Sequence, residues 1–366
     1  MGLKCFAIMK LYIQEDIIDR NDLMSWALEK GQRNEERWVV DIAEAIIAWF
    51  DRSKKVSIST SGSTGSPKII SHSKESMKIS ARMTAERFHL QSGMCSHNCL
   101  PARYIAGKMM LIRALEIDMD QICVAPRLAL SMPHILQEAD RIHFSAMTPM
   151  QLSATLDKHP DFINKIDQLI LGGAPIPRSL MTRIQQLKTR THATFGMTET
   201  ITHIATRQVN GLEQQEAFEV LKGVEISAED DNLIIKAKHL GSDPIKTTDQ
   251  VELISDRQFT WLGRSDDVIN RGGVKIHPAQ VEKKLSQAIQ QRYIITAEGD
   301  GLSGYKPALV IESRRFSHAD MKDLHDAIKD LDKLQRPENI YFVAQLIETP
   351  TSKVKRDINL YRSEST

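Results

Sequence analysis

Residues 60–68 read Thr60-Ser61-Gly62-Ser63-Thr64-Gly65-Ser66-Pro67-Lys68. The stretch combines five hydroxyl side chains and two glycines with a terminal lysine. Hydroxyls and backbone N–H groups donate hydrogen bonds, glycine permits close approach to the backbone, and the ammonium adds positive charge. The composition therefore predicts a loop that wraps a phosphate group. It is not a Walker A loop, in which glycine precedes the lysine and Ser or Thr follows it.

The neighbouring segments favour a structured loop over the alternative, a flexible Ser/Gly linker. Residues 55–59 alternate between polar and apolar side chains, which predicts a strand. Ser73 is a suitable N-cap, and four residues after it fall at helical spacing: Met77, Ala81, Thr84 and Phe88. We therefore expect the loop to lie between a short strand and a helix.

Length and composition predict a globular protein of two domains. The chain has 366 residues, of which 41% are hydrophobic and 26% charged, with a net charge of +1. This balance predicts no nucleic-acid partner, and no apolar run is long enough for membrane insertion. Charged residues interrupt the apolar residues of the N-terminus, so we expect no signal peptide and a cytoplasmic location. The four cysteines predict buried thiols rather than disulfides or a zinc site.

The pattern of segments predicts a layered α/β fold. Residues 1–50 favour helices, and strands alternate with helices from residue 55 onward. A smaller α+β unit is expected to begin near Gly263. We therefore predict a large domain over residues 1–262 and a small, mobile domain over residues 263–366.

Further motifs follow the loop at intervals. Gly172-Gly173-Ala174 follows a predicted strand, Thr194-Phe195-Gly196-Met197-Thr198-Glu199 ends another, and Thr248-Asp249 follows in turn. Residues 263–273 read Gly-Arg-Ser-Asp-Asp-Val-Ile-Asn-Arg-Gly-Gly, and residues 349–356 read Thr-Pro-Thr-Ser-Lys-Val-Lys-Arg. Taken singly, these segments are also compatible with simple turns or a solvated tail.

In this order and spacing, the motifs resemble those of the adenylate-forming superfamily, which includes acyl- and aryl-CoA ligases, nonribosomal adenylation domains and luciferases. The resemblance extends over nearly the whole chain after residue 50, and we interpret the chain as a form shortened at its N-terminus. It implies ATP-binding roles for two groups of residues. The first group is Thr60, Ser61, Gly62, Ser63, Thr64, Gly65 and Lys68. The second is Gly172, Gly173, Ala174, Thr194, Phe195, Gly196, Met197, Asp249 and Arg264.

The resemblance also implies catalytic and mechanical roles. Thr198 would contact the α-phosphate, Glu199 would hold Mg²⁺, and Lys353 would be the catalytic lysine, with Lys355 as the alternative register. Asp266 would be the hinge. The loop that enters the site in a second conformation would comprise Arg271, Gly272 and Gly273. The sequence departs from the family pattern where Phe195 replaces the commoner tyrosine, and where Thr248 and Ser352 replace glycines.

The implied reaction joins a small-molecule carboxylic acid to a thiol. ATP would activate the carboxylate as an acyl-adenylate with loss of pyrophosphate, and CoA would then take the acyl group. Residues 101–110 and 145–152 resemble the o-succinylbenzoate–CoA ligase branch, which serves menaquinone synthesis. The resemblance suggests acyl-substrate contacts at Tyr104, Gly107, Lys108, Arg113 and Thr148.

Two alternatives remain from the sequence. The chain is either another aryl- or acyl-CoA ligase of this superfamily or a non-catalytic sensor of nucleotides or acyl-adenylates. The replacement of glycine by Ser352 is the only feature that favours the sensor, and the retained Glu199, Asp249, Arg264 and Lys353 oppose it. The oligomeric state is open, with a homo-oligomer as one option.

Overall fold

The computed structural model describes residues 9–32, 35–59, 68–299, 304–313, 318–349 and 354–362. The chain divides into two compact units. The first contains residues 1–176, 183–224 and 236–243, and the second contains residues 177–182, 225–235 and 244–366. The predicted domain boundary between residues 262 and 263 stays a prediction.

A largely parallel sheet forms the centre of the first unit. Its strands run in the order β11-β10-β9-β8-β7-β5-β6-β1-β2, and the neighbours from β9 to β1 are parallel. The bounds are β1 Lys10–Ile13, β2 Asp16–Asp19, β5 Cys95–Asn98, β6 Asp120–Cys123, β7 Ile142–Met147, β8 Ile166–Leu171, β9 Arg190–Gly196, β10 His203–Gln208 and β11 Phe218–Val220. Strands β7 and β8 are buried at almost every position, as expected for parallel strands covered on both faces.

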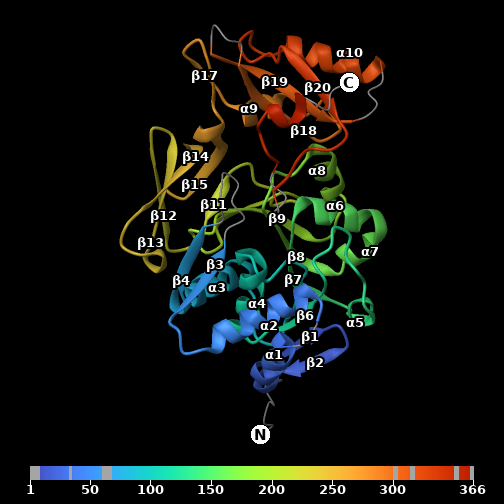
Figure 1. Ribbon diagram of the computed structural model, residues 1–366, viewed down its shortest axis with the longest axis vertical. Coiled ribbons are helices and arrows are strands. Elements are labelled where there is room, and N and C mark those ends of the chain that lie inside the picture. Colours follow the sequence, from blue (N-terminus) through green and yellow to red (C-terminus); the bar gives the residue numbers. More distant parts are fainter. Residues whose placement is uncertain are drawn as a thin grey trace. The chain divides into compact units, whose positions relative to one another are not determined.

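Helices cover both faces of this sheet, which confirms the predicted layered α/β fold. Figure 1 draws α1–α4 in blue and teal on one side, and α6 and α7 in green on the other. The bounds are α1 Leu23–Gln32, α2 Arg37–Phe50, α3 Lys74–Phe88, α4 Ile105–Ile117, α5 His134–Glu138, α6 Pro149–Lys158, α7 Pro160–Ile163 and α8 Arg178–Ile184. The hydrophobic core beneath α1–α4 includes the predicted α3 residues Met77, Ala81 and Phe88.

The chain changes direction in the sheet between β5 and β7. From β5 the connection through α4 leads to β6 on one side, whereas β7, β8 and β9 follow on the other. Because parallel crossovers are right-handed, this reversal puts the connecting helices on opposite faces. Ligands of such sheets bind at the carboxyl ends of the strands next to the reversal.

The expectation that residues 1–50 are mainly helical was incomplete. The hairpin β1–β2 precedes the two helices, and β1 pairs in parallel with β6 through Leu11↔Gln121 and its neighbours. Its partner lies about a hundred residues away, and four-residue strands carry too little periodicity to be recognised locally. On α2, Ile42, Ile46 and Trp49 are buried, and Trp38 is partly buried.

The second unit contains antiparallel strands followed by a small α+β element. The bounds are β12 Val224–Glu229, β13 Asn232–Ala237, β14 Ile245–Leu253, β15 Gln258–Arg264, β16 Ile269–Arg271, β17 Val274–Ile276, α9 Pro278–Leu285, β18 Tyr293–Gly299, β19 Tyr305–Glu312, α10 His318–Lys329, β20 Asn339–Val343 and α11 Asn359–Arg362. Strands β18, β19 and β20 form a sheet whose core includes Val281, Ile295 and Leu309. The α+β character expected for the segment after residue 263 is therefore confirmed.

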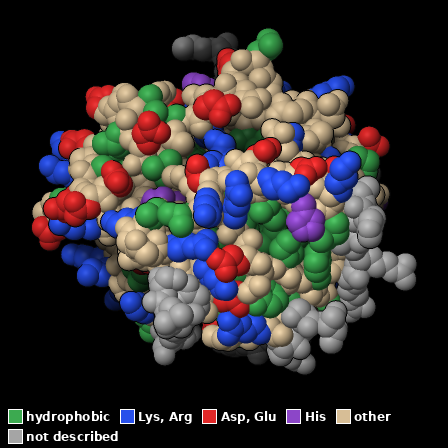
Figure 2. Space-filling model, turned by 90° about the horizontal axis from the view of Figure 1, so that it is seen from above, with side chains coloured by type: hydrophobic (Ala, Val, Ile, Leu, Met, Phe, Trp, Pro, Cys, Tyr) green, Lys and Arg blue, Asp and Glu red, His purple; other side chains and the backbone are tan. Residues whose placement is uncertain are grey.

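The surface carries both signs of charge. Figure 2 shows Lys and Arg side chains interspersed with Asp and Glu on the face that it displays. Within the described ranges, no helix combines the length and apolar character needed to cross a bilayer.

Candidate active site

The predicted phosphate loop joins the two strands of a hairpin. Strand β3 (Lys55–Ser59) pairs antiparallel with β4 (Ile69–Ser73), and Ser59 lies opposite Ile69. Residues 60–67, which include Thr60, Ser61, Gly62, Ser63, Thr64 and Gly65, lie outside the described residues, and exposed Lys68 directly precedes β4. The loop is therefore followed by a strand, not directly by the helix as expected. Ser73 caps α3 as predicted, because its hydroxyl accepts a 2.9 Å hydrogen bond from the Ser76 N–H.

The carboxyl ends of β7, β8 and β9 bring several predicted residues together. Thr148 follows β7 and caps α6 through a reciprocal pair of hydrogen bonds with Gln151. Gly172, Gly173 and Ala174 follow β8, and a Cβ on Gly173 would lie 3.9 Å from the Thr148 methyl group. This edge adjoins the reversal between β5 and β7, where the fold favours ligand binding.

Thr194 ties β9 to the glycine turn after β8. Its hydroxyl donates a 3.0 Å hydrogen bond to the Leu171 carbonyl. A Cβ on Gly172 would come within 2.8 Å of that same hydroxyl oxygen, so glycine is required for this close approach. Phe195, the next residue of β9, has its ring 6.0 Å from Phe218 in an edge-to-face arrangement. The sequence reading did not single out Phe218, which β11 contributes from a later part of the chain.

The loop after β9 carries Thr198 and Glu199. Gly196 ends the strand. The Met197 N–H lies 3.0 Å from the Thr200 hydroxyl oxygen and donates to it, and the Met197 carbonyl oxygen lies 3.0 Å from the same hydroxyl and accepts from it. His72 in β4 contacts the same loop, because its Nε2 lies 2.7 Å from the Thr198 carbonyl oxygen and must donate to it. The structure thus joins the segment after the phosphate loop to the Thr-Glu motif.

Sequence reasoning missed His72. Burial lowers the pKa of this histidine, while the Thr198 carbonyl and the charge of Glu199 act in the opposite direction. The local signal was weak, because a histidine in a five-residue strand has no distinguishing pattern. Its contact with a loop more than a hundred residues later appears only in the folded chain.

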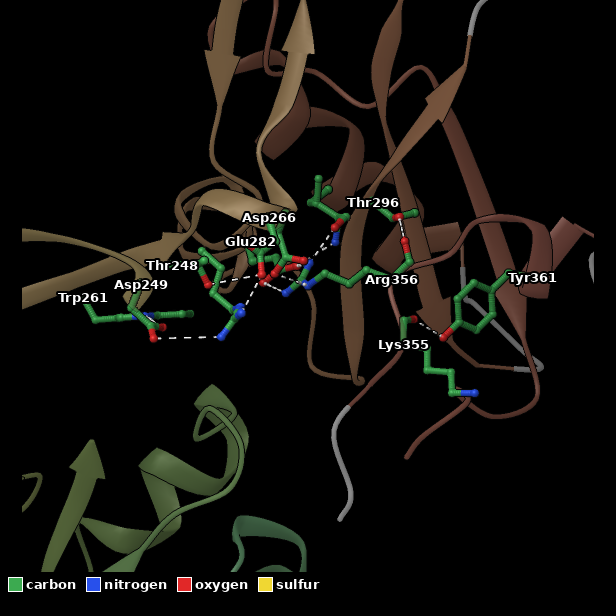
Figure 3. A network of polar contacts seen from close by, with 12 residues as sticks. Thr248, Asp249, Trp261, Asp266, Glu282, Thr296, Lys355, Arg356 and Tyr361 are labelled. Atoms are coloured by element: carbon green, nitrogen blue, oxygen red, sulfur yellow. Dashed lines mark hydrogen bonds and ion pairs between the residues drawn. The ribbon is translucent and has the colours of Figure 1, made fainter. Parts of the chain in front are cut away.

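Asp249 and Arg264 face each other across β14 and β15 in the second unit. Figure 3 shows Asp249 beside Trp261. Asp249 is 7% exposed, and its Oδ1 accepts a 2.8 Å hydrogen bond from the Trp261 indole N–H. The Arg264 guanidinium lies 3.9 Å from Asp249 Oδ2 and 2.6 Å from Asp266 Oδ2. Thr248, which replaces the family glycine, donates a 3.2 Å hydrogen bond to Asp266. The predicted ribose-binding and hinge residues therefore form one polar network.

A tight turn at Gly272 and Gly273 joins β16 to β17. Gly272 and Gly273 have φ values of +57° and +86°, which two-residue hairpin turns require and glycine readily adopts. Arg271 points into its own unit, where it donates a 3.1 Å hydrogen bond to the Leu334 carbonyl and pairs with Glu338. The loop assigned to the second conformation is thus an ordered hairpin whose arginine is engaged by a carboxylate.

A partly buried ion pair anchors the C-terminal segment. Arg356 donates hydrogen bonds of 2.5 and 3.0 Å to the two carboxylate oxygens of Glu282 in α9, and another of 2.6 Å to the Ile295 carbonyl (Figure 3). It also lies 3.6 Å from Asp267. Lys353 lies outside the described residues, whereas Lys355 is exposed and its carbonyl accepts a 2.7 Å hydrogen bond from Tyr361.

The acyl-substrate candidates on α4 point to different neighbours. Tyr104 precedes the helix and stacks with Arg103 at 5.0 Å. Position 107 requires glycine, because a Cβ there would clash with the Leu100 and Pro101 carbonyl oxygens at 2.5 Å.

Lys108 is buried near Asp41 and Glu44 of α2, and its pKa is lowered by burial against the raising effect of both carboxylates. Arg113 instead contacts Thr84 and Thr202. The structure therefore does not bring these two cations together, and their roles in acid binding stay predictions.

Comparison with known proteins shows the family of the chain. The family model described as AMP-binding enzyme matches residues 47–232. The chain is 22% identical over 330 residues to a 2-succinylbenzoate–CoA ligase of Bacillus cytotoxicus, an alignment that covers 82% of this chain and 68% of the relative.

Two solved structures show the same fold. An AMP-forming acyl-CoA synthetase/AMP-acid ligase II-like protein of Dyadobacter fermentans aligns with a TM-score of 0.59 and 28% identity, over 91% of this chain and 96% of that one. The o-succinylbenzoate coenzyme A synthetase of Bacillus subtilis, solved with ATP and magnesium, aligns with a TM-score of 0.68 and 22% identity, over 82% of this chain and 68% of that one. The chain belongs to the AMP-binding enzyme family of adenylate-forming CoA ligases.

Proposed function

We propose that this chain is an ATP-dependent acid–thiol ligase that converts o-succinylbenzoate to o-succinylbenzoyl-CoA, a step of menaquinone biosynthesis. The observation that carries the proposal is the Thr198–Glu199 loop, which follows β9 and is held by His72 from the strand after the phosphate loop. A second support is the set of predicted residues that converge at the carboxyl ends of β7, β8 and β9. The names of the relatives favour this acid among those that the family activates.

In the first half-reaction, the acid carboxylate attacks the α-phosphate of ATP and pyrophosphate leaves. Two anions must approach in line, so the protein has to fix the geometry and offset the repulsion. The glycine turn at Gly172–Gly173 exposes backbone to the adenine, with Phe195 beside it. Asp249 accepts the ribose hydroxyls, and Arg264 contacts ribose or phosphate. Thr198, the loop of residues 60–68 and Lys353 bind the phosphates.

Glu199 fits a magnesium ion that arrives with the nucleotide. Its carboxylate is exposed, and no three His, Cys, Asp or Glu side chains converge as a ligand cluster in the ranges that the structure covers. Mg²⁺ usually takes one or two protein carboxylates and completes its shell with substrate phosphates and water. The bound ion would neutralise charge that develops on the departing phosphates.

In the second half-reaction, the thiol of CoA attacks the acyl carbon and AMP leaves. Lys353 has to withdraw so that the thiol can reach the same carbon. A pivot at Asp266, between a domain of residues 1–262 and one of residues 263–366, would exchange Lys353 for the loop at Arg271, Gly272 and Gly273. The contacts of Asp266 with Arg264 and Thr248 support this hinge, because they connect it to the ribose-binding aspartate.

The test measures pyrophosphate release with MgATP and a panel of acids, followed by mass detection of the CoA thioester. We expect o-succinylbenzoate to be preferred over benzoate, acetate and malonate. Glu199→Gln should lower adenylation by about 10²-fold, the usual scale for losing one electrostatic group of an active site. Glu213→Gln, at an exposed surface glutamate, serves as the control.

Each of the other outcomes would indicate a different function for this chain or a different site. A clear preference for another acid would make the chain a CoA ligase of different specificity. Nucleotide binding without pyrophosphate release for any acid would indicate a sensor. Equal activity of Glu199→Gln and the unmodified chain would refute the site assignment.

A further inference from the structure

The loop between β9 and β10 has a backbone conformation that needs support. Ile201 has φ of +68°, which is disfavoured for a β-branched side chain, and its side chain is fully buried. The Thr200 hydroxyl, also buried, bridges the loop. It accepts from the Met197 N–H, and its single proton is shared between the Met197 and Thr202 carbonyls, at 3.0 and 2.8 Å. Glu199 therefore lies in a tight segment whose shape depends on a few specific hydrogen bonds.

Arg113 contacts the far end of this loop from inside the fold. It lies on α4, is 1% exposed, and donates a 2.7 Å hydrogen bond to the Thr202 hydroxyl. Its Nε donates a 3.2 Å hydrogen bond to Thr84 of α3, and Nη1 lies 3.6 Å from the Met110 sulfur. The guanidinium thus contacts α3, its own helix α4 and the loop between β9 and β10.

No carboxylate among the described residues forms an ion pair with Arg113, and burial lowers its pKa to about 9. It nevertheless remains protonated at neutral pH. Arg113 and Arg87 both help to lower the pKa of buried His203, the residue after Thr202, so two cations act on this histidine. Burying a cation without a partner is unfavourable, so a role limited to packing would be served better by an apolar side chain.

The loop is consequently held at both ends. His72 binds the Thr198 carbonyl ahead of Glu199, and Arg113 binds the Thr202 hydroxyl behind it. A charged donor makes a stronger hydrogen bond than a neutral one, which suits a segment with a disfavoured residue at its centre. On the basis of the proposed function, we propose that Arg113 is a positioning residue for magnesium-nucleotide binding, acting through Thr202 to hold Thr198 and Glu199 in place.

The chain offers a matched control for this contact. Arg87 of α3 donates a 3.0 Å hydrogen bond to Thr206, a buried threonine four residues after Thr202. Both contacts link a helical arginine to a threonine hydroxyl in or beside β10, but only Thr202 belongs to the loop. The variants are therefore Thr202→Val, Thr202→Ser, which keeps the hydroxyl, and Thr206→Val.

Two measurements test the proposal. The first is amide hydrogen exchange of residues 197–202 in the ligand-free protein, and the second is calorimetric titration with MgATP. In Thr202→Val, the amides of residues 197–202 should exchange about tenfold faster, because one hydrogen bond to a charged group is lost. This variant should also bind MgATP about tenfold more weakly by the same argument. Thr202→Ser and Thr206→Val should match the unmodified chain in both measurements.

The results separate this proposal from its competitors. Unchanged exchange and unchanged MgATP affinity in Thr202→Val would overturn it. Equal loss in Thr206→Val would also overturn it, because general destabilisation would then explain the effect. A higher KM for the acid with unchanged MgATP affinity would instead assign Arg113 to the acyl substrate. If the unmodified chain bound no MgATP, the proposed function would fail, and the exchange comparison would still decide whether this contact orders the loop.

Discussion

At the residue scale, the most informative departure from the family pattern is Thr248. Glycine at this position has no side chain, whereas the Thr248 hydroxyl donates to the Asp266 carboxylate. Arg264 binds the same carboxylate oxygen, so Asp266 has two partners on the strands that precede it. The substitution therefore adds a contact to Asp266, the proposed hinge residue.

Lys353 is the residue for which the two half-reactions give opposite expectations. Lys353→Ala should lower adenylation by about 10²-fold, because a positioned cation that offsets transition-state charge is lost. Thioester formation from supplied acyl-adenylate should stay within about twofold, since the lysine acts only in the first step. Pyrophosphate release and thioester formation are measured separately.

Lys355→Ala is the matched control for this experiment, because Lys355 is exposed and its described hydrogen bonds are made by its backbone. If Lys355→Ala lost adenylation and Lys353→Ala did not, the register of the motif would be shifted. Equal loss of both steps in Lys353→Ala would argue against a role confined to adenylation.

His72 gives a second prediction at this scale. His72→Phe should raise the KM for MgATP about tenfold, because the hydrogen bond from the ring to the Thr198 carbonyl is lost. His72→Gln can still donate and should recover part of the loss. Steady-state kinetics at saturating acid measure the effect. Equal KM values for both variants would show that donation by residue 72 does not matter.

At the element scale, the Arg356–Glu282 pair ties the C-terminal segment to α9 and β18. The side chains are 23% and 18% exposed. Because the pair is partly buried and bidentate, Arg356→Met should leave Glu282 without its main partner. We expect the second unit to lose about 2–3 kcal/mol, below the full cost for a completely buried pair. Urea unfolding combined with amide exchange in β18 measures the loss.

Arg362→Met provides the comparison for Arg356. Arg362 is 46% exposed and pairs with Glu298, which also accepts hydrogen bonds from Tyr341 and Asn339. Glu298 is buried but keeps the hydrogen bonds from Tyr341 and Asn339, so replacing Arg362 should cost less than replacing Arg356, about 1 kcal/mol. Equal losses in the two variants would show that bidentate geometry and burial do not distinguish these arginines.

At the scale of the whole molecule, buried histidines make the stability of the first unit depend on pH. Burial lowers the pKa of His97 and His192 to about 3, and that of His203 lies well below the ordinary value of 6.5. Below pH 6.5 the unfolded chain therefore binds protons that the folded chain excludes. Stability should fall as the pH decreases from 6.5, by about 1.4 kcal/mol per pH unit for each histidine.

Urea unfolding at pH 7.5 and 5.5 tests this dependence in a Trp261→Phe background, because the other three tryptophans, Trp26, Trp38 and Trp49, lie in the first unit. His97→Leu should reduce the loss of unfolding free energy between pH 7.5 and 5.5 by the contribution of one histidine. His325→Leu, at an exposed position of α10, should leave it unchanged. A slope that is the same in all three chains would exclude His97 as a source.

The sequence alone determined the features that depend on neighbouring residues. The Ser73 cap, the strand that ends before Gly172, the strand that ends at Gly196 and the α+β character of the segment after residue 263 were predicted and are confirmed. Each has a local physical cause, such as a capping hydroxyl or a short apolar run that ends at a glycine. The order of the motifs was also sufficient to indicate the family.

Only the tertiary structure decided which distant segments meet. The pairing of β1 with β6, the strand β4 after the phosphate loop, and the contacts of His72 with Thr198 and Arg113 with Thr202 all join residues far apart in the chain. Their local sequences carry no signal, because a four-residue strand or a single buried cation gains its stability from partners elsewhere. The physical reason is that burial and hydrogen-bond pairing depend on proximity in space, whereas a sequence pattern records proximity along the chain.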